Sequence, residues 1–323
     1  MPAVPRILLV KTSSMGDVIH NLPVVSDIRS RYPSFDIDWL VEESFADIPA
    51  LHPGVAHVIP VATRRWRKTL YRPQTWREMR EMRARLAHTA YDFILDTQGL
   101  LKSGLLARLA HGERFGLDRR SAREPLAALC YDKVFSVDPD AHAVVRYRTL
   151  AAQAFDLAPN LPLDYGVQIP NTRLNWLPAG RYAVLLHATS RAEKLWPEAD
   201  WVALGADLHQ RGIIAVLPWG GLAEYERAQR LASAIPNAIV APRLTLKEAA
   251  RLLKQASLVV GVDTGLVHLA TAVGTPTIGI YGGSDPAKNG LYANTPIRNL
   301  GGPGHAPSRA EVIAAAEEIL AHA

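Results

Sequence analysis

The chain of 323 residues has little cysteine and no long apolar run. Its single cysteine, Cys130, excludes an intramolecular disulfide and a zinc site made only of cysteines. The apolar run Ile7–Val10 is too short for a secretory signal, so we expect a cytosolic protein. The most apolar long stretch, 259–282, is interrupted by Asp263, His268 and Pro276. We therefore predict no membrane-spanning helix, and any contact with a membrane should be peripheral.

Several short motifs of known sites are also missing. The segment 99–104 lacks the spacing of a phosphate-binding P-loop, and the loop at 12–17 lacks the three glycines of a dinucleotide fingerprint. No Gly-x-Ser-x-Gly turn occurs, and the 11 histidines show no spacing typical of metal ligands. The sequence therefore gives no reason to expect a resident metal or a serine nucleophile of that type.

Positive charge is concentrated in one segment. The formal charge of +5 hides nine basic and two acidic residues in Thr63–Arg85, a net +7, so the rest of the chain nets −2. Such a segment can bind nucleic acid, a membrane or an anionic ligand, or can be a solvated helix face. We expect no nucleic-acid partner, because no nucleic-acid motif is present and the residues from Leu161 onward are nearly balanced in charge.

Short apolar strands alternate with helical patterns along both halves of the chain. A proline-rich stretch, Leu157–Pro178, separates the halves, so we predict a domain at 1–165 and another at 166–323. A terminal helix at about 308–322 is a candidate for packing back on the first domain. The expected strands are Arg6–Val10, Ile37–Val41, Val58–Val61, Phe93–Leu95, Ala183–His187, Ile213–Leu217, Leu258–Val262 and Thr277–Tyr281. The expected helices are Asp17–Arg31, Pro73–His88, Ser103–Ala110, Trp201–Gln210, Glu224–Ser233, Leu246–Gln255, Leu266–Ala272 and Ala310–Ala321.

The loop after the first strand carries the first candidate site. Gly16 permits a tight turn, and Asp17 follows at the start of the expected helix. The helix dipole favours an ionised carboxylate there, which could accept a proton from a hydroxyl. Aspartate is also a preferred helix cap, and the residues alone favour that interpretation.

Polar loops follow strands in the second half too, where open α/β sheets bind ligands. The loop at 187–197 offers two hydroxyls and a lysine that suit a diphosphate, although a solvated loop is as consistent with its composition. Asp263 could bind sugar hydroxyls or cap a helix, while Gly265 lets backbone N–H groups approach a phosphate. His268 is either a site residue or a core histidine. Glu224, after a strand and a glycine turn, could bind a ribose.

Taken together, these segments resemble the lipopolysaccharide heptosyltransferases of glycosyltransferase family 9. The resemblance rests on three motifs and runs along nearly the whole chain. The first motif, near the N-terminus, is typical of heptosyltransferases of the first type, and the Asp-Thr-Gly motif with its histidine is typical of the wider family. The matching segments are Lys11–His20 with Leu22-Pro23, Asp96–Leu100 with Lys102-Ser103, and Asp263–Leu266 with His268.

The resemblance implies an α/β chain of GT-B type, with two Rossmann-like doubly wound domains facing a central cleft. It implies an inverting transfer of L-glycero-D-manno-heptose from ADP-heptose to a Kdo sugar of Kdo2-lipid A. That step belongs to lipopolysaccharide core synthesis at the cytoplasmic face of a Gram-negative inner membrane. We expect no cofactor and no metal, because Lys194 and the helix start at Thr264 can neutralise the diphosphate.

By the same resemblance Asp17 is the general base. Glu224 is the expected ribose contact, with Glu226 as a close alternative. The expected donor-binding residues are Thr189, Ser190, Lys194, Glu224, Asp263, Thr264, Gly265 and His268. The expected acceptor-binding residues are Ser14, Met15, Gly16, Arg64, Arg65, Arg67, Lys68, Gln98, Lys102, Arg119 and Arg120.

Three other functions are compatible with parts of this pattern. A family member could use a different lipopolysaccharide core acceptor. A GT-B nucleotide-sugar epimerase would not need the basic segment Thr63–Arg85. A non-catalytic sugar-nucleotide or lipid-binding protein would not need an aspartate at position 17.

Overall fold

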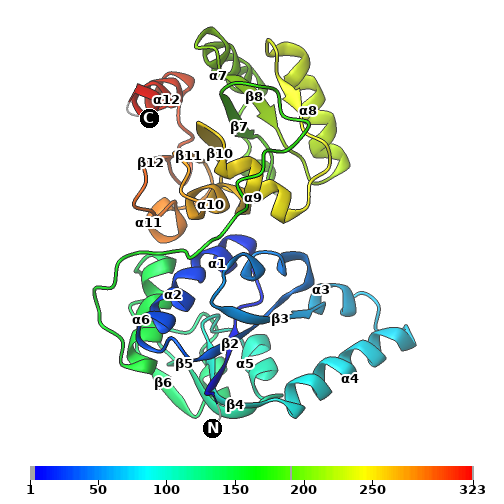
Figure 1. The fold of residues 1–323 in the computed structure, drawn as a ribbon, viewed down its shortest axis with the longest axis vertical. Coiled ribbons are helices and arrows are strands. Elements are labelled where there is room, and N and C mark those ends of the chain that lie inside the picture. The colour runs from blue at the N-terminus through cyan, green and yellow to red at the C-terminus, as the bar shows by residue number, and fades with distance from the viewer. Residues whose placement is uncertain (1–3, 190, 322–323) are drawn as a thin grey trace. The chain divides into compact units, whose positions relative to one another are not determined.

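The computed structural model describes residues 4–189 and 191–321. The chain forms two compact units, Met1–Val167 and Gln168–Ala323. Each unit contains a six-stranded parallel sheet with helices packed on it (Figure 1). The predicted α/β class, with two doubly wound sheets, is therefore confirmed.

The N-terminal unit has the strand order β3-β2-β1-β4-β5-β6, which is that of a Rossmann sheet. Its central strand β1 is an apolar run because Ile7–Val10 is buried on both faces of the sheet. Helices α3, α4 and α5 cover one face, and α1, α2 and α6 form a packed group of their own. The elements are β1 (Arg6–Val10), α1 (Met15–His20), α2 (Leu22–Arg31), β2 (Asp36–Glu42), η1 (Glu43–Phe45), η2 (Pro49–Leu51), β3 (Val55–Val61), α3 (Thr63–Trp66), α4 (Pro73–His88), β4 (Ala90–Asp96), α5 (Leu101–Ala107), β5 (His111–Leu117), η3 (Pro125–Cys130), β6 (Lys133–Phe135) and α6 (Ala143–Phe155).

Two features of this unit differ from the sequence prediction. The single helix expected at Asp17–Arg31 is two helices, α1 and α2, that meet at Asn21. Pro23 lies in the first turn of α2, where its missing N–H costs nothing, whereas inside one long helix its ring would clash with the preceding turn. Strands β5 and β6 and helix α6 were not predicted at all.

The C-terminal unit repeats the same topology. Its strand order is β12-β11-β10-β7-β8-β9. Read from the β9 edge and numbered within the unit, this order is 3-2-1-4-5-6, as in the N-terminal unit. Helices α7, α8 and α12 supply core residues on the sheet, while α9 and α10 pack together. The elements are β7 (Tyr182–Leu186), η4 (Ala192–Lys194), α7 (Glu198–Gln210), β8 (Ile214–Leu217), α8 (Leu222–Ala234), β9 (Ile239–Val240), α9 (Leu246–Lys254), β10 (Leu258–Val262), α10 (Gly265–Ala272), β11 (Thr277–Tyr281), α11 (Pro286–Asn289), β12 (Ile297–Gly301) and α12 (Arg309–Ala321).

The terminal helix α12 belongs to this C-terminal unit. Its buried residues Val312, Ala316 and Ile319 are part of the core that also contains Trp196 and Trp201. The apolar side of α12 is therefore covered within its own unit. None of the helices in the described part of the chain has the length and apolar character that a bilayer span requires.

Candidate active site

In the N-terminal unit the strand order reverses between β1 and β4, so their loops diverge at the carboxyl edge of the sheet. Ligands of doubly wound sheets bind at such a point. The backbone N–H and the hydroxyl of Thr12 donate to Oε1 of Gln98 at 2.7 and 2.8 Å, which joins the two loops. The buried carboxylate of Asp96 in turn accepts from the Gln98 N–H at 2.8 Å. These bonds fix the loop that leads to Asp17.

Asp17 is the third residue of α1, one turn inside the cap residue Ser14. Its Oδ2 accepts from the Ser14 N–H at 2.9 Å and from the Ser14 hydroxyl at 2.8 Å. Its Oδ1 accepts from the hydroxyl of Tyr147 on α6 at 2.7 Å. The carboxylate thus closes the helix start, as in a capping box, and it is also held by a residue 130 positions away.

A buried lysine sets the charge around this carboxylate. Lys11 is 2% exposed, and its Nζ lies 3.7 Å from the ring centroid of Tyr147 and donates to the Thr97 carbonyl at 3.3 Å. Burial lowers the pKa of Lys11 to about 8, although the negative charges of Asp17 and Asp96 oppose that shift.

The pKa values of the carboxylate and the phenol move in opposite directions. Burial alone would raise the pKa of Asp17, but Lys11 and the hydrogen bonds from Ser14 and Tyr147 hold it well below its usual range. Burial and the Asp17 charge raise the pKa of Tyr147 well above its ordinary value. At neutral pH Asp17 is therefore an anion and Tyr147 a neutral donor.

Several expected acceptor residues lie around Asp17. Ser14 caps α1, and Met15 and Gly16 form its first turn. The Gln98 side chain is 7% exposed, and within the described residues its amide nitrogen has no hydrogen-bond partner. Lys102, on α5, donates to the Ser13 hydroxyl at 3.3 Å. The structure thus brings these residues to the same edge of the sheet as the carboxylate.

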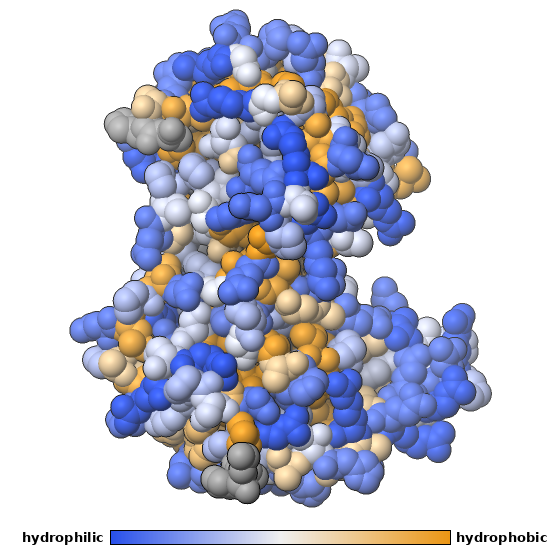
Figure 2. Space-filling model, viewed as in Figure 1, coloured by the Kyte–Doolittle hydropathy of each residue, from blue (hydrophilic) through white to orange (hydrophobic). Residues whose placement is uncertain are grey.

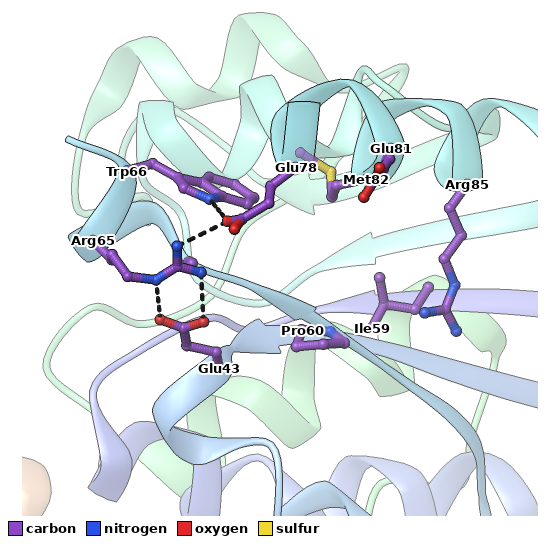
Figure 3. A pocket seen from close by; sticks show the side chains of 10 residues that line it. Glu43, Ile59, Pro60, Arg65, Trp66, Glu78, Glu81, Met82 and Arg85 are labelled. Atoms are coloured by element: carbon purple, nitrogen blue, oxygen red, sulfur yellow. Dashed lines mark hydrogen bonds and ion pairs between the residues drawn. The ribbon is translucent and has the colours of Figure 1, made fainter. Parts of the chain in front are cut away.

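The expected basic residues of the segment after β3 differ in their ion pairing. The guanidinium of Arg65 makes two bonds of 3.0 Å to Glu43 and one of 2.8 Å to Glu78, whose carboxylate also accepts from Trp66 (Figure 3). These bonds fasten α3 to η1 and α4 beside a pocket of about 290 Å³. Two carboxylates of the same unit therefore neutralise Arg65, which is one of the expected acceptor contacts.

The other expected basic residues of this segment are exposed, as Arg65 is. Arg64 lies over the ring of Phe45 at 5.2 Å, and Arg67 and Lys68 follow α3. Helix α4, cyan in Figure 1, has almost no buried side chains, and its visible surface in Figure 2 is nearly all blue. Much of the +7 segment is thus a solvated helix face. The expected residues Arg119 and Arg120 are exposed after β5.

In the C-terminal unit the order reverses between β7 and β10, and the second group of expected residues lies there. The hydroxyl of Thr189 donates to the Asp263 carbonyl at 3.2 Å and joins the two loops. The Asp263 carboxylate receives Lys194 Nζ at 2.5 Å and the Ser284 hydroxyl at 2.6 Å, both on Oδ2. Nε2 of the buried His268 is 3.7 Å from Oδ1. Lysine, histidine and serine thus converge on one carboxylate.

These contacts hold Asp263 in its charged form. Burial raises its pKa, but His268, Lys194 and Ser284 together lower the pKa well below the usual range. Thr264 is the cap of α10 and Gly265 its first residue, so the N–H groups of that helix start are next to the carboxylate.

Two expected donor residues need separate mention. Glu224 accepts from the Gly220 N–H at 2.7 Å and so points back to the loop after β8, whereas Glu226 is exposed on α8. Ser190 lies outside the described residues.

Sequence reasoning missed three residues of these two clusters. Lys11 stands in a recognised motif but was given no role, and Ser284 follows β11 in a Gly-Gly-Ser turn that could have signalled a site. Tyr147 lies on α6, which carries no motif. In the described ranges, no group of three His, Cys, Asp or Glu side chains is arranged as metal ligands would be.

Comparison with known proteins agrees with this geometry. The chain is 46% identical over 297 residues to lipopolysaccharide heptosyltransferase 1 of Pseudomonas aeruginosa, covering 90% of this chain and 82% of that protein. It is 45% identical over 305 residues to lipopolysaccharide heptosyltransferase 1 of Escherichia coli K12, covering 91% and 95%.

Solved structures give the same result. The structure of E. coli heptosyltransferase WaaC with ADP superposes with a TM-score of 0.89 at 42% identity, over 97% of this chain and 99% of that one. WaaC has also been solved with ADP-2-deoxy-2-fluoro heptose. The fold is therefore GT-B. A family model described as glycosyltransferase family 9 (heptosyltransferase) matches residues 79–314. This chain belongs to glycosyltransferase family 9, the heptosyltransferases.

Proposed function

We propose that this enzyme transfers L-glycero-D-manno-heptose from ADP-heptose to a Kdo residue of Kdo2-lipid A, with inversion at the transferred carbon. The observation that carries the proposal is the Asp17 carboxylate, held ionised by Lys11, Ser14 and Tyr147 in the loop after β1. The names and bound ligands of the relatives supply the identity of the sugar nucleotide. The acceptor and the inversion are those implied by the family.

Asp17 acts as the general base on the acceptor hydroxyl. Among the described residues, Tyr147 alone donates a hydrogen bond to Oδ1, so one lone pair is free to take the proton. As the proton leaves, the acceptor oxygen attacks the donor carbon from the face opposite ADP. General-base assistance of this kind is worth about 10²–10⁴-fold in rate.

The donor residues hold the leaving diphosphate. Lys194 is paired with Asp263 in the structure, so its charge is already at the helix start where the phosphates would bind. Lys194, with the hydroxyls of Thr189 and Ser190, would bind the diphosphate, and the N–H groups at Thr264 and Gly265 would add to it. Once Lys194 turns to the phosphate, Asp263 is free to bind heptose hydroxyls, and His268 lines that site. Glu224 rather than Glu226 binds the ribose.

The acceptor meets the N-terminal unit. Gln98 and Lys102 bond to Thr12 and Ser13 in the loop that leads to Asp17, and the free amide nitrogen of Gln98 suits a sugar oxygen. Arg64, Arg67, Lys68, Arg119 and Arg120 bind the phosphates and carboxylates of Kdo2-lipid A. We assign Arg65 to fastening α3, because Glu43 and Glu78 already neutralise it. Since the acceptor is a membrane lipid, the enzyme acts as a peripheral protein at the cytoplasmic face of a Gram-negative inner membrane.

ADP release from ADP-heptose tests the proposal. We expect release only when Kdo2-lipid A is present, in step with formation of the heptosylated lipid. Lipid A acceptors that already carry a heptose should be poor substrates, which separates this activity from that of other family members. Release of ADP without acceptor, or recovery of an altered sugar nucleotide, would contradict the proposal and favour an epimerase-like activity.

A further inference from the structure

Helix α5 and the short helix η3 bury small side chains between them and expose large apolar ones, the opposite of what a buried helix pair does. The two elements pack against each other through small residues, and a Cβ on Gly104 would come within 3 Å of Cys130. The large apolar side chains point outward instead, with exposed fractions of 38% to 61%. The outward residues are Leu101, Leu105, Leu126 and Leu129, which we call the leucine surface.

The spacing of these leucines gives each element one apolar outer side. Leu101 and Leu105 are four residues apart on an α-helix, and Leu126 and Leu129 are three apart on a 3₁₀ helix, so each pair shares a side. Single exposed leucines are ordinary on soluble proteins, but a group of them on neighbouring elements marks an interaction site. In the described part of the C-terminal unit, Leu222 is the only large apolar side chain of comparable exposure.

Positive charge surrounds the leucine surface. The exposed basic residues on these elements and the adjoining loop are Lys102, Arg108, Arg119, Arg120 and Arg123. Arg119, Arg120 and Arg123 form no ion pair with any described residue. Two acids lie among them. Asp118 accepts from the backbone N–H groups of Arg120 and Ser121 at 3.1 and 2.8 Å, and Glu124 accepts from the backbone N–H of Leu101 at 2.6 Å. Apolar side chains ringed by arginine and lysine are typical of proteins that bind an anionic lipid surface.

The leucine surface also adjoins the site of the base. Lys102, between two of the leucines in the α5 turn, bonds to Ser13 in the Asp17 loop. The charge of Arg123 is close enough to oppose protonation of Lys11. A lipid acceptor reaching Asp17 would thus pass beside these elements.

We propose that the leucine surface inserts into the headgroup region of a bilayer that contains anionic phospholipids, while the surrounding basic residues bind lipid phosphates. Its purpose, presenting a membrane lipid to Asp17, rests on the proposed function. A second copy of the chain is a weaker candidate, because a two-fold contact would bring the same arginines face to face.

Vesicle co-sedimentation tests this surface without any substrate. The variant Leu105→Gln/Leu126→Gln/Leu129→Gln should bind vesicles of phosphatidylethanolamine and phosphatidylglycerol at least about tenfold more weakly than the unchanged protein. The unchanged protein should bind vesicles of phosphatidylcholine alone more weakly than the anionic ones. Leu222→Gln, which removes an exposed leucine from the other unit, is the matched control and should bind like the unchanged protein.

Two measurements keep the outcome decisive. Thermal unfolding and ADP release with detergent-dispersed acceptor should be the same for the triple variant and the unchanged protein. If the triple variant does not fold, Leu126→Gln alone carries the test, because that leucine is the most exposed of the four. Full vesicle binding by a folded variant overturns the proposal, as does a dimer that the same substitutions dissociate. Vesicle binding is measured without ADP-heptose or acceptor. Its outcome therefore does not depend on whether the enzyme transfers heptose as proposed.

Discussion

Each unit has a lysine and an aspartate in the loops where its strand order reverses, between β1 and β4 or between β7 and β10. The two units arrange this pair differently. In the C-terminal unit Lys194 touches Asp263 directly, and both side chains are 16% exposed. In the N-terminal unit Lys11 is 2% exposed. Its ammonium lies 3.7 Å from the ring centroid of Tyr147, and the hydroxyl of that tyrosine donates to Asp17. Lys194, to which we assign a ligand, is thus the more exposed of the two lysines, whereas Lys11, to which we assign only an electrostatic effect on Asp17, is buried.

The sharpest test of this difference is Asp17→Ala. We expect kcat to fall by about 10²–10⁴-fold, because the acceptor hydroxyl loses its base. The dissociation constant of ADP, measured by calorimetry, should stay near normal because the donor residues belong to the other unit. Turnover close to that of the unchanged enzyme would remove Asp17 from its assigned role.

The buried lysine should be visible in the pH dependence of stability. Lys11 loses its proton near pH 8 when folded but near 10.5 when unfolded, so between these values the unfolded chain binds more protons. The free energy of unfolding of the unchanged protein, relative to that of Lys11→Met, should therefore rise by up to about 3 kcal/mol from pH 8 to pH 10.5. Denaturant titrations at several pH values measure this. Parallel curves for the two proteins would show that Lys11 keeps an ordinary pKa.

Substitution of Lys194, the more exposed lysine, should change the affinity for ADP-heptose and not the pH dependence of stability. Lys194→Met should weaken ADP-heptose binding about 10- to 100-fold, because it removes a charge-assisted bond to the diphosphate. Lys254→Met is a suitable control, since Lys254 in the same unit bonds to the Val273 carbonyl. If Lys194→Met changed kcat and left the KM for ADP-heptose alone, the division of roles between the two lysines would be wrong.

The smallest effect is expected at Tyr147. Tyr147→Phe keeps the ring beneath Lys11 but removes the donor to Asp17, and should lower kcat about tenfold. Loss of a hydrogen bond to the carboxylate raises the pKa of Asp17, so the acid limb of the kcat profile should move to higher pH. Tyr91→Phe is the matched control, because that phenol also bonds to an aspartate, Asp38, at 2.9 Å in the same unit. An unmoved acid limb in Tyr147→Phe would leave the tyrosine with a structural role only.

The elements that the sequence predicted well are those whose pattern is local. The strands β1, β10 and β11 are apolar runs buried on both faces, and α4 begins at a proline, so their limits were predicted exactly. Strand β5 was missed because Gly112 and Gly116 interrupt its pattern. The reason for Gly116 is tertiary, since the ring of Tyr131 occupies the space where its Cβ would be.

The sequence by itself determined the fold class and the loops that carry the chemistry, because hydrophobic periodicity and turn residues act over a few positions. Only the tertiary structure decided the charge state and availability of the side chains in those loops. Tyr147 reaches Asp17 across 130 positions, and Glu43 neutralises Arg65 from 22 positions away. Burial and Coulomb interactions depend on distance in space, and they separate one arginine or lysine from the next where the sequence shows only the same letter.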